Sequence, residues 1–472
     1  MQPEAPTPDP ERSAAPTPSD PGPGSAARRT VVRGLGVTGI GYPLSVALLF
    51  FGNVLAARLL TRDDFGSYSL AVSIFTTLAL VTQLGIPHSM LRRASAAISA
   101  GQDGATRNEV VSAFVIGTVA AVVVAGAFAL PVGREALHAI FTRAGVAALA
   151  ALIGLRVGVR ILENIAPEAL RAFRDFFRVS LYDGLLANFL FVVVLAVVLV
   201  GDLQVSAADV LAISLATAAA AFVPAAWAIH TRLRGLGHVP LRLHNPVEPA
   251  MWMATIGRAV LAQLDLLLVG ILATSAQVAT YAVPFRLALF VGFPLILVNQ
   301  VVPPLIASWH SGQGEERLER TLRGTAGLAF LGSVGVALVF IVAGKPLIHL
   351  LFGHKYVVGW GVLCILSLGQ VAQTYLGSCG FALMMTGNQR VYAWILTVST
   401  VVTAGLDVIG WHLWGLEGVA LATAASLTLQ NVVQAAVLHR LTGFSSVADL
   451  RLCLGEGRNL VARLRGRSTR GS

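Results

Sequence analysis

Long apolar runs, separated by short polar segments, recur along almost the whole chain. Each run is about 20 residues long, the length that an α-helix needs to cross the hydrocarbon core of a bilayer. The pattern therefore predicts an all-α integral membrane protein with about 12 transmembrane helices. We place these spans at 34–57, 67–86, 110–131, 144–165, 179–200, 208–229, 250–273, 279–302, 325–343, 357–381, 391–411 and 416–437.

The composition supports this fold class. Of the 472 residues, 55% are hydrophobic and only 12% are charged, which excludes an ordinary soluble domain of this length. The polar segments are short, so any binding site has to be built from the helices. We expect a disordered cytoplasmic tail at 1–29, an N-terminal six-helix lobe at 30–229, a cytoplasmic inter-lobe loop at 230–249, a C-terminal six-helix lobe at 250–440 and a basic cytoplasmic tail at 441–472.

A weak internal repeat relates the two predicted lobes. Four residues around the first external turn recur at one offset in the second half, namely Leu55, Leu59, Thr61 and Tyr68 as Leu268, Leu272, Thr274 and Tyr281. Because six spans separate the copies, both lobes enter the membrane from the same side. This arrangement is typical of transporters that place the substrate path between parallel repeats.

The basic residues predict the orientation, because cytoplasmic loops carry an excess of Lys and Arg. With both termini in the cytoplasm, 24 of the 34 basic side chains lie on the cytoplasmic side. Six lie outside: Arg58, Arg62, Arg134, Arg143, Lys345 and Lys355. The net charge of +10 is therefore explained mostly by the excess of basic residues on the cytoplasmic side. No nucleic-acid motif accompanies it, so we expect no nucleic-acid partner.

The cysteines and histidines do not indicate further chemistry. Cys364, Cys379 and Cys453 have no paired spacing, and the histidines are scattered along the chain. The sequence therefore predicts no disulfide framework, no metal site and no cofactor.

The remaining four basic residues, Arg156, Arg160, Arg258 and Arg286, fall inside predicted spans. An arginine at the centre of a bilayer costs roughly 2.5–3.5 kcal/mol on insertion scales. These side chains must therefore face protein, water or an anionic ligand. A cationic interior in a membrane protein indicates that it handles anions.

The spacing of the arginines predicts two polar walls. Asp265 and Arg286 lie about equally far from the turn between their helices, both roughly 10 Å into the membrane, and can form an ion pair. Arg258 lies two helical turns from Asp265 on the same face. In the fourth span, a second wall consists of Arg156, Arg160, Glu163 and Asn164.

Two interpretations of these walls stay open. Asp265 with Arg286, and Arg160 with Glu163, are either structural ion pairs or parts of a transport cavity. Arg156 and Arg258 lack an equally obvious partner. We therefore expect Arg156 and Arg258 to hold the anion, facing each other across a cavity between the lobes.

The acidic pair Asp63 and Asp64, in the first external loop, allows another interpretation. Two carboxylates there can serve as the catalytic base and metal site of a membrane glycosyltransferase or ligase. The chain has no large external domain, however. We therefore expect these side chains to cap the start of the second helix.

The first predicted hairpin resembles that of the polysaccharide repeat-unit flippases, in the segment NVLAARLLTRDDFGSYSLAVSIFTTLALVTQLGIPHSMLRRAS. In LDLLLVGILATSAQVATYAVPFRLA, Asp265, Tyr281 and Arg286 fit the family's Asp, Tyr and basic positions. Its later pattern is matched by LLFGHKYVVGWGVLCILSLGQ, MMTGNQRVYAW and GLEGVALATAAS, so the resemblance covers most of residues 30–440. On these motifs the chain is identified as a member of the O-antigen and exopolysaccharide flippase family, within the multidrug/oligosaccharidyl-lipid/polysaccharide (MOP) exporter superfamily.

This resemblance implies a multi-pass carrier of the cell membrane rather than an enzyme. Its substrate is expected to be a polyprenyl-diphosphate-linked oligosaccharide, moved from the inner to the outer leaflet by alternating access for cell-surface polysaccharide biosynthesis. We expect Arg156, Arg160, Arg258 and Arg286 to hold the diphosphate by charge-assisted hydrogen bonds. Asp265 and Glu163 are the candidate coupling or ion-pair residues.

Driving force and partners stay open at this point. Either the membrane potential drives outward movement of the anion, or Asp265 couples transport to H⁺ or Na⁺. A polysaccharide polymerase and glycosyltransferases are expected partners. The alternatives are a glycosyltransferase or ligase that uses Asp63 and Asp64, a multidrug-type antiporter of the same fold, and a transport-dead scaffold of a glycan assembly complex.

Overall fold

The computed structural model describes residues 23–236, 247, 252, 256–257, 260–309 and 315–449. All regular elements within these ranges are helical, as expected where a bilayer requires each backbone polar group to be satisfied within its own segment. Nine of the described helical segments are long and apolar enough to cross a membrane. The chain is therefore an all-α, multi-pass membrane protein. The number of spans and the side of the termini stay predictions.

The helices before residue 237 form a first group, which we call the N-terminal helices. They are α1 (Pro23–Leu59), α2 (Arg62–Thr82), α3 (Ile86–Ser99), α4 (Asp103–Ala129), α5 (Pro131–Ile140), the 3₁₀ segment η1 (Val146–Leu149), α6 (Ala150–Ala172), α7 (Phe176–Ser180), the π segment η2 (Leu181–Leu185), α8 (Leu186–Val200) and α9 (Ala207–Arg234). Within this group α6 packs against α2, α3, α4 and α9.

The second group, which we call the C-terminal helices, follows residue 260. It consists of α11 (Leu264–Leu272), α12 (Ser275–Trp309), α13 (Glu315–Phe352), the 3₁₀ segment η3 (His354–Gly359), α14 (Trp360–Leu376), α15 (Cys379–Met385) and α16 (Gln389–Thr442). Here α12, α13 and α14 pack on one another, α16 packs on α14, and α11 packs on α12 and α16.

The helix ends differ from the predicted spans in four places. α1 begins at Pro23, inside the range predicted as a disordered tail, while residues 1–22 lie outside the described residues. The fifth span is interrupted at Gly184, whose φ of 87° is left-handed. In the seventh span, residues 252, 256–257 and 260–261 are helical too, and α11 begins at Leu264 after a turn. α16, which contains the predicted eleventh and twelfth spans, consists of two helices separated by non-helical backbone at Trp414 and Gly415, and it ends at Thr442.

The segments predicted as cytoplasmic loop and tail are described only in part. In the predicted inter-lobe loop at 230–249, α9 continues to Arg234, and residues 237–246 lie outside the described residues. The start of the predicted tail at 441–472 folds back onto α14, because the Ala448 amide donates to the Tyr375 carbonyl at 2.8 Å.

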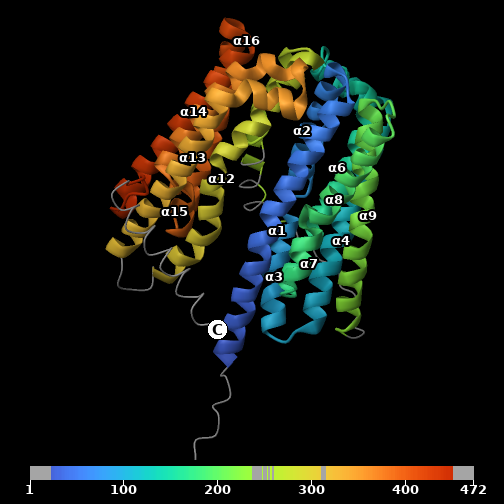
Figure 1. Ribbon diagram of the computed structural model, residues 1–472. Helices are drawn as coiled ribbons and strands as arrows, with labels where there is room; N and C mark the ends of the chain where they lie inside the picture. Colours follow the sequence, from blue (N-terminus) through green and yellow to red (C-terminus); the bar gives the residue numbers. More distant parts are fainter. Residues whose placement is uncertain are drawn as a thin grey trace, which may run out of the picture.

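The two groups of helices lie side by side and meet at one end of the molecule. Figure 1 shows the N-terminal helices in blue to green and the C-terminal helices in yellow to red. We call the end that carries the α1–α2 turn the upper end, and the opposite end, where α3 turns into α4, the lower end (Figure 1). The largest contact between the groups is that of α2 with α12.

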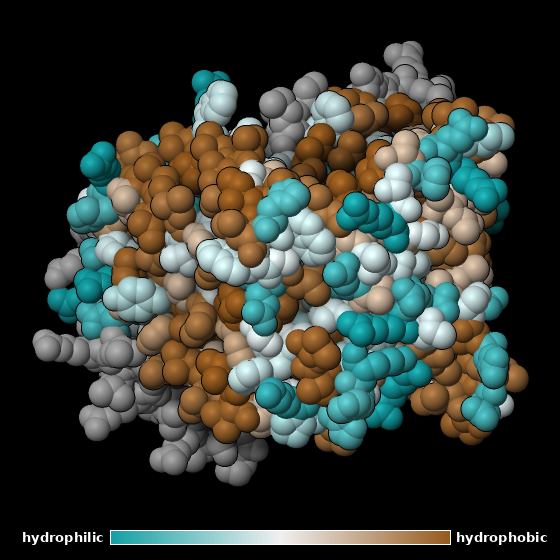
Figure 2. Space-filling view, turned by 90° about the horizontal axis from the view of Figure 1, so that it is seen from above, coloured by the Kyte–Doolittle hydropathy of each residue, from teal (hydrophilic) through white to brown (hydrophobic). Residues whose placement is uncertain are grey.

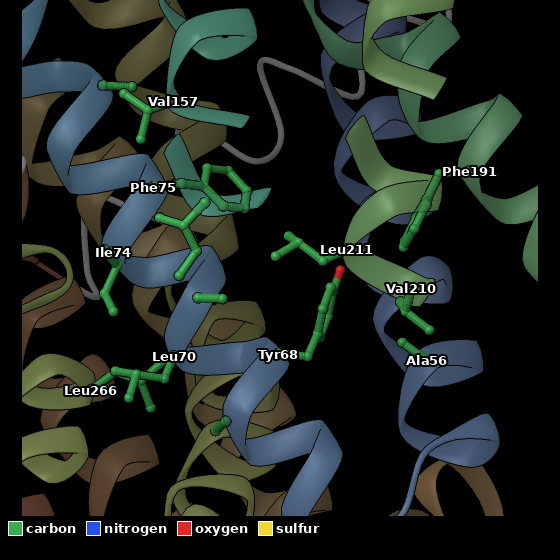
Figure 3. Close-up of a cluster of buried hydrophobic side chains, with 14 of the residues drawn as sticks. Ala56, Tyr68, Leu70, Ile74, Phe75, Val157, Phe191, Val210, Leu211 and Leu266 are labelled. Atoms are coloured by element: carbon green, nitrogen blue, oxygen red, sulfur yellow. The ribbon is translucent and has the colours of Figure 1, made fainter. Parts of the chain in front are cut away.

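Helix α2 forms the centre of the packing between the groups. Figure 3 shows Leu70 of α2 beside Leu266 of α11, while Tyr68 of the same helix extends toward Leu211 of α9. A Cβ on Gly270 would approach the Leu70 side chain to 2.4 Å, so α11 lies very close to α2 here. Viewed from above, polar and apolar side chains are interspersed over the upper end, and polar side chains lie at its centre as well as at its left and right edges (Figure 2).

Candidate functional site

The arginines of α6 share a single carboxylate. Arg156 Nη1 lies 2.8 Å from Glu163 Oε2, and Arg160 Nη1 lies 3.5 Å from the same oxygen. The predicted pair of Arg160 and Glu163 is present. The sequence offered no equally obvious partner for Arg156, and the structure shows that Glu163 is that partner as well, because two helical turns bring Arg156 and Glu163 onto one face.

The two α6 arginines differ in their exposure. The Arg156 and Glu163 side chains are each 9% exposed, whereas the Arg160 side chain is 38% exposed. Arg156 also lies over the ring of Phe75 at 4.8 Å and donates to the Ser214 hydroxyl at 3.4 Å. Arg156 is therefore held in place, and Arg160 is the arginine of this pair that a ligand can reach.

Arg286 of α12 lies at the contact between the two groups of helices. Its Nη1 donates to the Ser69 hydroxyl of α2 at 3.2 Å, and its guanidinium lies over the Phe65 ring at 5.2 Å. Among the described residues no carboxylate lies within ion-pair distance of Arg286. Arg286 is thus a partly buried cation whose charge is not neutralised by the groups that surround it.

The predicted ion pair between Asp265 and Arg286 does not form. Instead Asp265 Oδ2 accepts a hydrogen bond from the Tyr281 hydroxyl at 3.0 Å, and its Oδ1 accepts one from the Leu266 amide. Tyr281 and Arg286 are five residues apart on α12, which places them about 140° apart around the helix. Asp265 faces the side of α12 that carries Tyr281. Although Asp265 and Arg286 were predicted at the same depth in the membrane, Arg286 points in another direction around the helix.

Asp265 belongs to a buried acidic cluster within the C-terminal helices. Asp407 of α16 is 0% exposed, and Asp265 is 3% exposed. Thr423 donates to Asp407 Oδ1 at 3.2 Å. Asp407 Oδ2 has no hydrogen-bond partner among the described residues. Each of these two buried carboxyl groups can take up a proton or contribute oxygens to a cation.

The sequence analysis did not single out Asp407. The signal was present, because an aspartate within an apolar span is as costly as the arginines that were singled out. The aromatic residues of α2 were missed as well. They carried no signal, because Phe and Tyr are ordinary in an apolar helix.

The aromatic side of α2 connects the two arginine sites. Arg286 stacks on Phe65 and Arg156 on Phe75, ten residues further along α2, which corresponds to roughly 15 Å along the helix axis. The arginines therefore follow one another in depth, with Arg286 nearest the upper end and Arg156 further down.

The other predicted site residues lie apart from this arrangement or outside the described residues. Arg258 lies outside them, so its predicted position opposite Arg156 stays a prediction. The side chain that caps α2 is that of Thr61 and not that of Asp63 or Asp64: Thr61 Oγ1 accepts from the Asp64 amide at 3.1 Å and donates to Asp64 Oδ2 at 2.6 Å. Asp63 is exposed beside it. No group of three potential metal ligands occurs among the described residues.

Comparison with protein families gives a match over most of the chain. Residues 54–359 match the model of a family described as polysaccharide biosynthesis protein. A curated relative, a probable low-salt glycan biosynthesis flippase from Haloferax volcanii, is 23% identical over 195 residues. That match spans 41% of this chain and 41% of the relative.

Solved structures show the same fold. An inward-facing multidrug resistance MATE family transporter of the MOP superfamily superposes with a TM-score of 0.68 at 14% identity, covering 84% of this chain and 94% of that one. An outward-facing structure of such a transporter gives 0.61 at 14% identity, covering 88% and 95%. A MOP superfamily transporter from Pyrococcus furiosus also gives 0.61 at 14% identity, with coverages of 88% and 95%. The matched structures are described as transporters, and the curated relative as a probable flippase.

Proposed function

Because the chain belongs to the family of polysaccharide biosynthesis proteins, we propose that it is a flippase for a polyprenyl-diphosphate-linked oligosaccharide. It moves this lipid from the inner to the outer leaflet, where the glycan is used for cell-surface polysaccharide. The name of the Haloferax relative supports the activity. The MOP transporter fold supports alternating access, in which the two groups of helices open to one side at a time.

In this proposal the upper end faces outward. Arg107 and Arg232, counted for the cytoplasmic side, lie near the lower ends of α4 and α9, whereas Arg58 and Arg62, counted outside, flank the α1–α2 turn at the upper end. The helices meet at the upper end, and the higher TM-score is that to the inward-facing transporter. Both observations support a state that is open toward the cytoplasm.

The observation that carries the proposal is the excess of interior positive charge. Arg156, Arg160 and Arg286 have one ion-paired carboxylate between them, Glu163, among the described residues. A diphosphate diester carries an ionised oxygen on each phosphorus and matches this excess. Arg160 receives the diphosphate at the accessible lower position, and Arg286 binds it where the two groups of helices meet. Guanidinium groups suit this role because they bind phosphate oxygens in a bidentate manner.

We propose in addition that the Asp265 and Asp407 cluster couples transport to H⁺ or Na⁺. It lies within the C-terminal helices, away from Arg286, so that the ion and the lipid-linked anion do not compete for one site. Two buried carboxyl groups close to one another are unstable as two anions. Binding of a cation or proton therefore changes how α11 packs on α12 and α16, and α12 carries Arg286.

Export in a deletion strain tests the flippase assignment. The strain is complemented with the parent chain, with Arg286→Gln or with the control Arg134→Gln, whose arginine is exposed at the upper end. Loss of the charge at Arg286 should lower export at least tenfold, because a charge-assisted hydrogen bond contributes about 1.5–3 kcal/mol. Undelivered lipid-linked oligosaccharide should then accumulate on the inner leaflet. The control should export normally, and Arg258→Ala should behave like Arg286→Gln.

The same strains separate the alternatives. A glycosyltransferase or ligase would leave unprocessed lipid-linked oligosaccharide on the outer leaflet, and Asp63→Asn would abolish its activity. A scaffold would export normally with Arg286→Gln. Either result contradicts the flippase proposal.

Inverted vesicles with an imposed pH or Na⁺ gradient test the coupling. Asp407→Asn should remove the acceleration that the gradient gives to the parent, whereas Asp202→Asn, in an exposed loop, should keep it. Should the gradient have no effect on the parent either, the membrane potential alone drives transport and the coupling proposal is wrong.

A further inference from the structure

Basic side chains at the upper end bind helix ends of the opposite group. The last turn of α13 leaves carbonyl oxygens without partners inside the helix, as every α-helix does at its C-terminus. Arg58, at the end of α1, donates through Nε to the Leu351 carbonyl at 2.8 Å and through Nη2 to the Leu350 carbonyl. A cation at this position is also favoured by the helix dipole.

The contact is reciprocal. Lys355 of η3 donates to the Leu60 carbonyl, directly after the end of α1. The buried Tyr356 hydroxyl donates to the Ala57 carbonyl in the last turn of α1 at 3.3 Å. Each group of helices thus supplies the polar cap for a helix end of the other group.

Two more arginines cross between the groups at the same level. Arg143 donates to the Leu272 carbonyl at the end of α11 at 3.2 Å. Arg62 donates to the Ala276 carbonyl and to the Thr280 hydroxyl of α12, each at 3.2 Å through Nε. Four of the six basic residues that the sequence placed outside therefore bind the opposite group: Arg58, Arg62, Arg143 and Lys355.

The backbones of the two groups come into contact beneath these residues. A Cβ on Gly66 of α2 would lie 1.8 Å from the Ser275 carbonyl oxygen of α12, so only glycine permits this approach. Beside it the Ser67 and Ser275 hydroxyls are 3.2 Å apart, and both donate to the Ala144 carbonyl. The upper end is closed by direct contact and not merely by neighbouring side chains.

We propose that Arg58, Lys355, Arg143 and Arg62 form a latch that holds the upper end closed and is released in each transport cycle. The proposal rests on the alternating access proposed above. The acceptors are neutral carbonyl groups, and Arg58 is exposed, so water can replace the carbonyls when the groups separate. A buried ion pair in this place would leave two unpaired charges on opening. Hydrogen bonds from basic side chains to helix ends therefore hold the upper end closed and can still be broken when it opens.

Disulfide formation between Ser67→Cys and Ser275→Cys measures closure of the upper end. The native cysteines Cys364, Cys379 and Cys453 are replaced by alanine in the full-length chain, which is then studied in membrane vesicles. Removing the latch charges with Arg58→Met and Lys355→Met should slow disulfide formation about tenfold or more, the factor that corresponds to one hydrogen bond from a charged donor.

The chain provides matched controls of the same residue types at the same end. Arg134 is exposed, and Lys345 stacks on Trp360 of its own group at 4.6 Å. Arg134→Met and Lys345→Met should leave the rate of disulfide formation unchanged. Equal rates for the latch variants and the controls would overturn the proposal.

The disulfide assay needs no substrate, so it tests the latch independently of the flippase assignment. Normal latch behaviour without export contradicts the flippase assignment alone. Unchanged disulfide formation with normal export contradicts the latch alone. Thermal unfolding of the purified variants verifies that a slower rate reflects opening and not loss of the fold.

Discussion

The basic side chains at the two ends of the molecule bind different kinds of partner. At the lower end, Arg178 and Arg232 both bind Asp175, at 3.2 and 2.9 Å, within the N-terminal helices. Arg323 binds Asp449 at 2.9 Å within the C-terminal part of the chain. At the upper end, by contrast, Arg58 and Lys355 bind carbonyl groups of the opposite group.

The difference corresponds to what each end has to do in an alternating-access carrier. Ion pairs inside one group move with that group and never need to break, so a carboxylate partner has no disadvantage there. Contacts between the groups have to break in every cycle. Neutral acceptors make this possible, because water replaces a carbonyl as a hydrogen-bond partner at small net cost.

The largest effect is expected where the two groups touch at the upper end. In Gly66→Ala, the new Cβ cannot be accommodated 1.8 Å from the Ser275 carbonyl oxygen, so α2 and α12 must separate. Overpacking of this kind costs about 1–3 kcal/mol. Disulfide formation between Ser67→Cys and Ser275→Cys should nearly cease, and export should be lost because the upper end no longer closes.

Gly126→Ala is the matched control. Gly126 also lies in an α-helix, and nothing would lie within 4 Å of its Cβ. Normal export and disulfide formation are expected for this variant. If Gly66→Ala behaved in the same way, direct contact between α2 and α12 would not be what closes the upper end.

Much of the fold followed from the sequence, because hydrophobic length and charge are the constraints that a bilayer imposes. All-α membrane architecture and the family were predicted and are confirmed. Side-chain partners were predicted less well. We predicted that Asp265 contacts Arg286 because both lie at the same depth. Asp265 instead contacts Tyr281, because Tyr281 and Arg286 lie on different sides of α12.

The latch illustrates what a sequence does not contain. Arg58 and Lys355 were counted only as external charges. Every residue has a backbone carbonyl, so the sequence does not indicate which carbonyl a basic side chain binds. Their acceptors lie almost 300 positions away, in another helix end. Only the packing of the two groups identifies them.

An intermediate effect is expected at the lower end. Asp175→Asn removes the carboxylate shared by Arg178 and Arg232 and weakens the cap of α7. The Asp175 side chain is 14% exposed, so we expect a loss of about 1–3 kcal/mol in the free energy of unfolding. Thermal unfolding of the purified protein should report it. Disulfide formation at the upper end should stay unchanged, and a change there would show that the two ends are not independent.

The smallest effect is expected for the most exposed ion pair of the lower end. Arg171 Nη2 lies 3.3 Å from Asp183 Oδ2, with side chains that are 36% and 57% exposed, so water and salt screen the pair. Asp183→Asn should cost less than about 1 kcal/mol, as exposed pairs usually do. Arg171 keeps its second partner, Glu168. Unfolding measured at low and at high salt should differ less for Asp183→Asn than for the parent. A loss as large as that of Asp175→Asn would mean that this pair, too, fixes the lower end of the N-terminal helices.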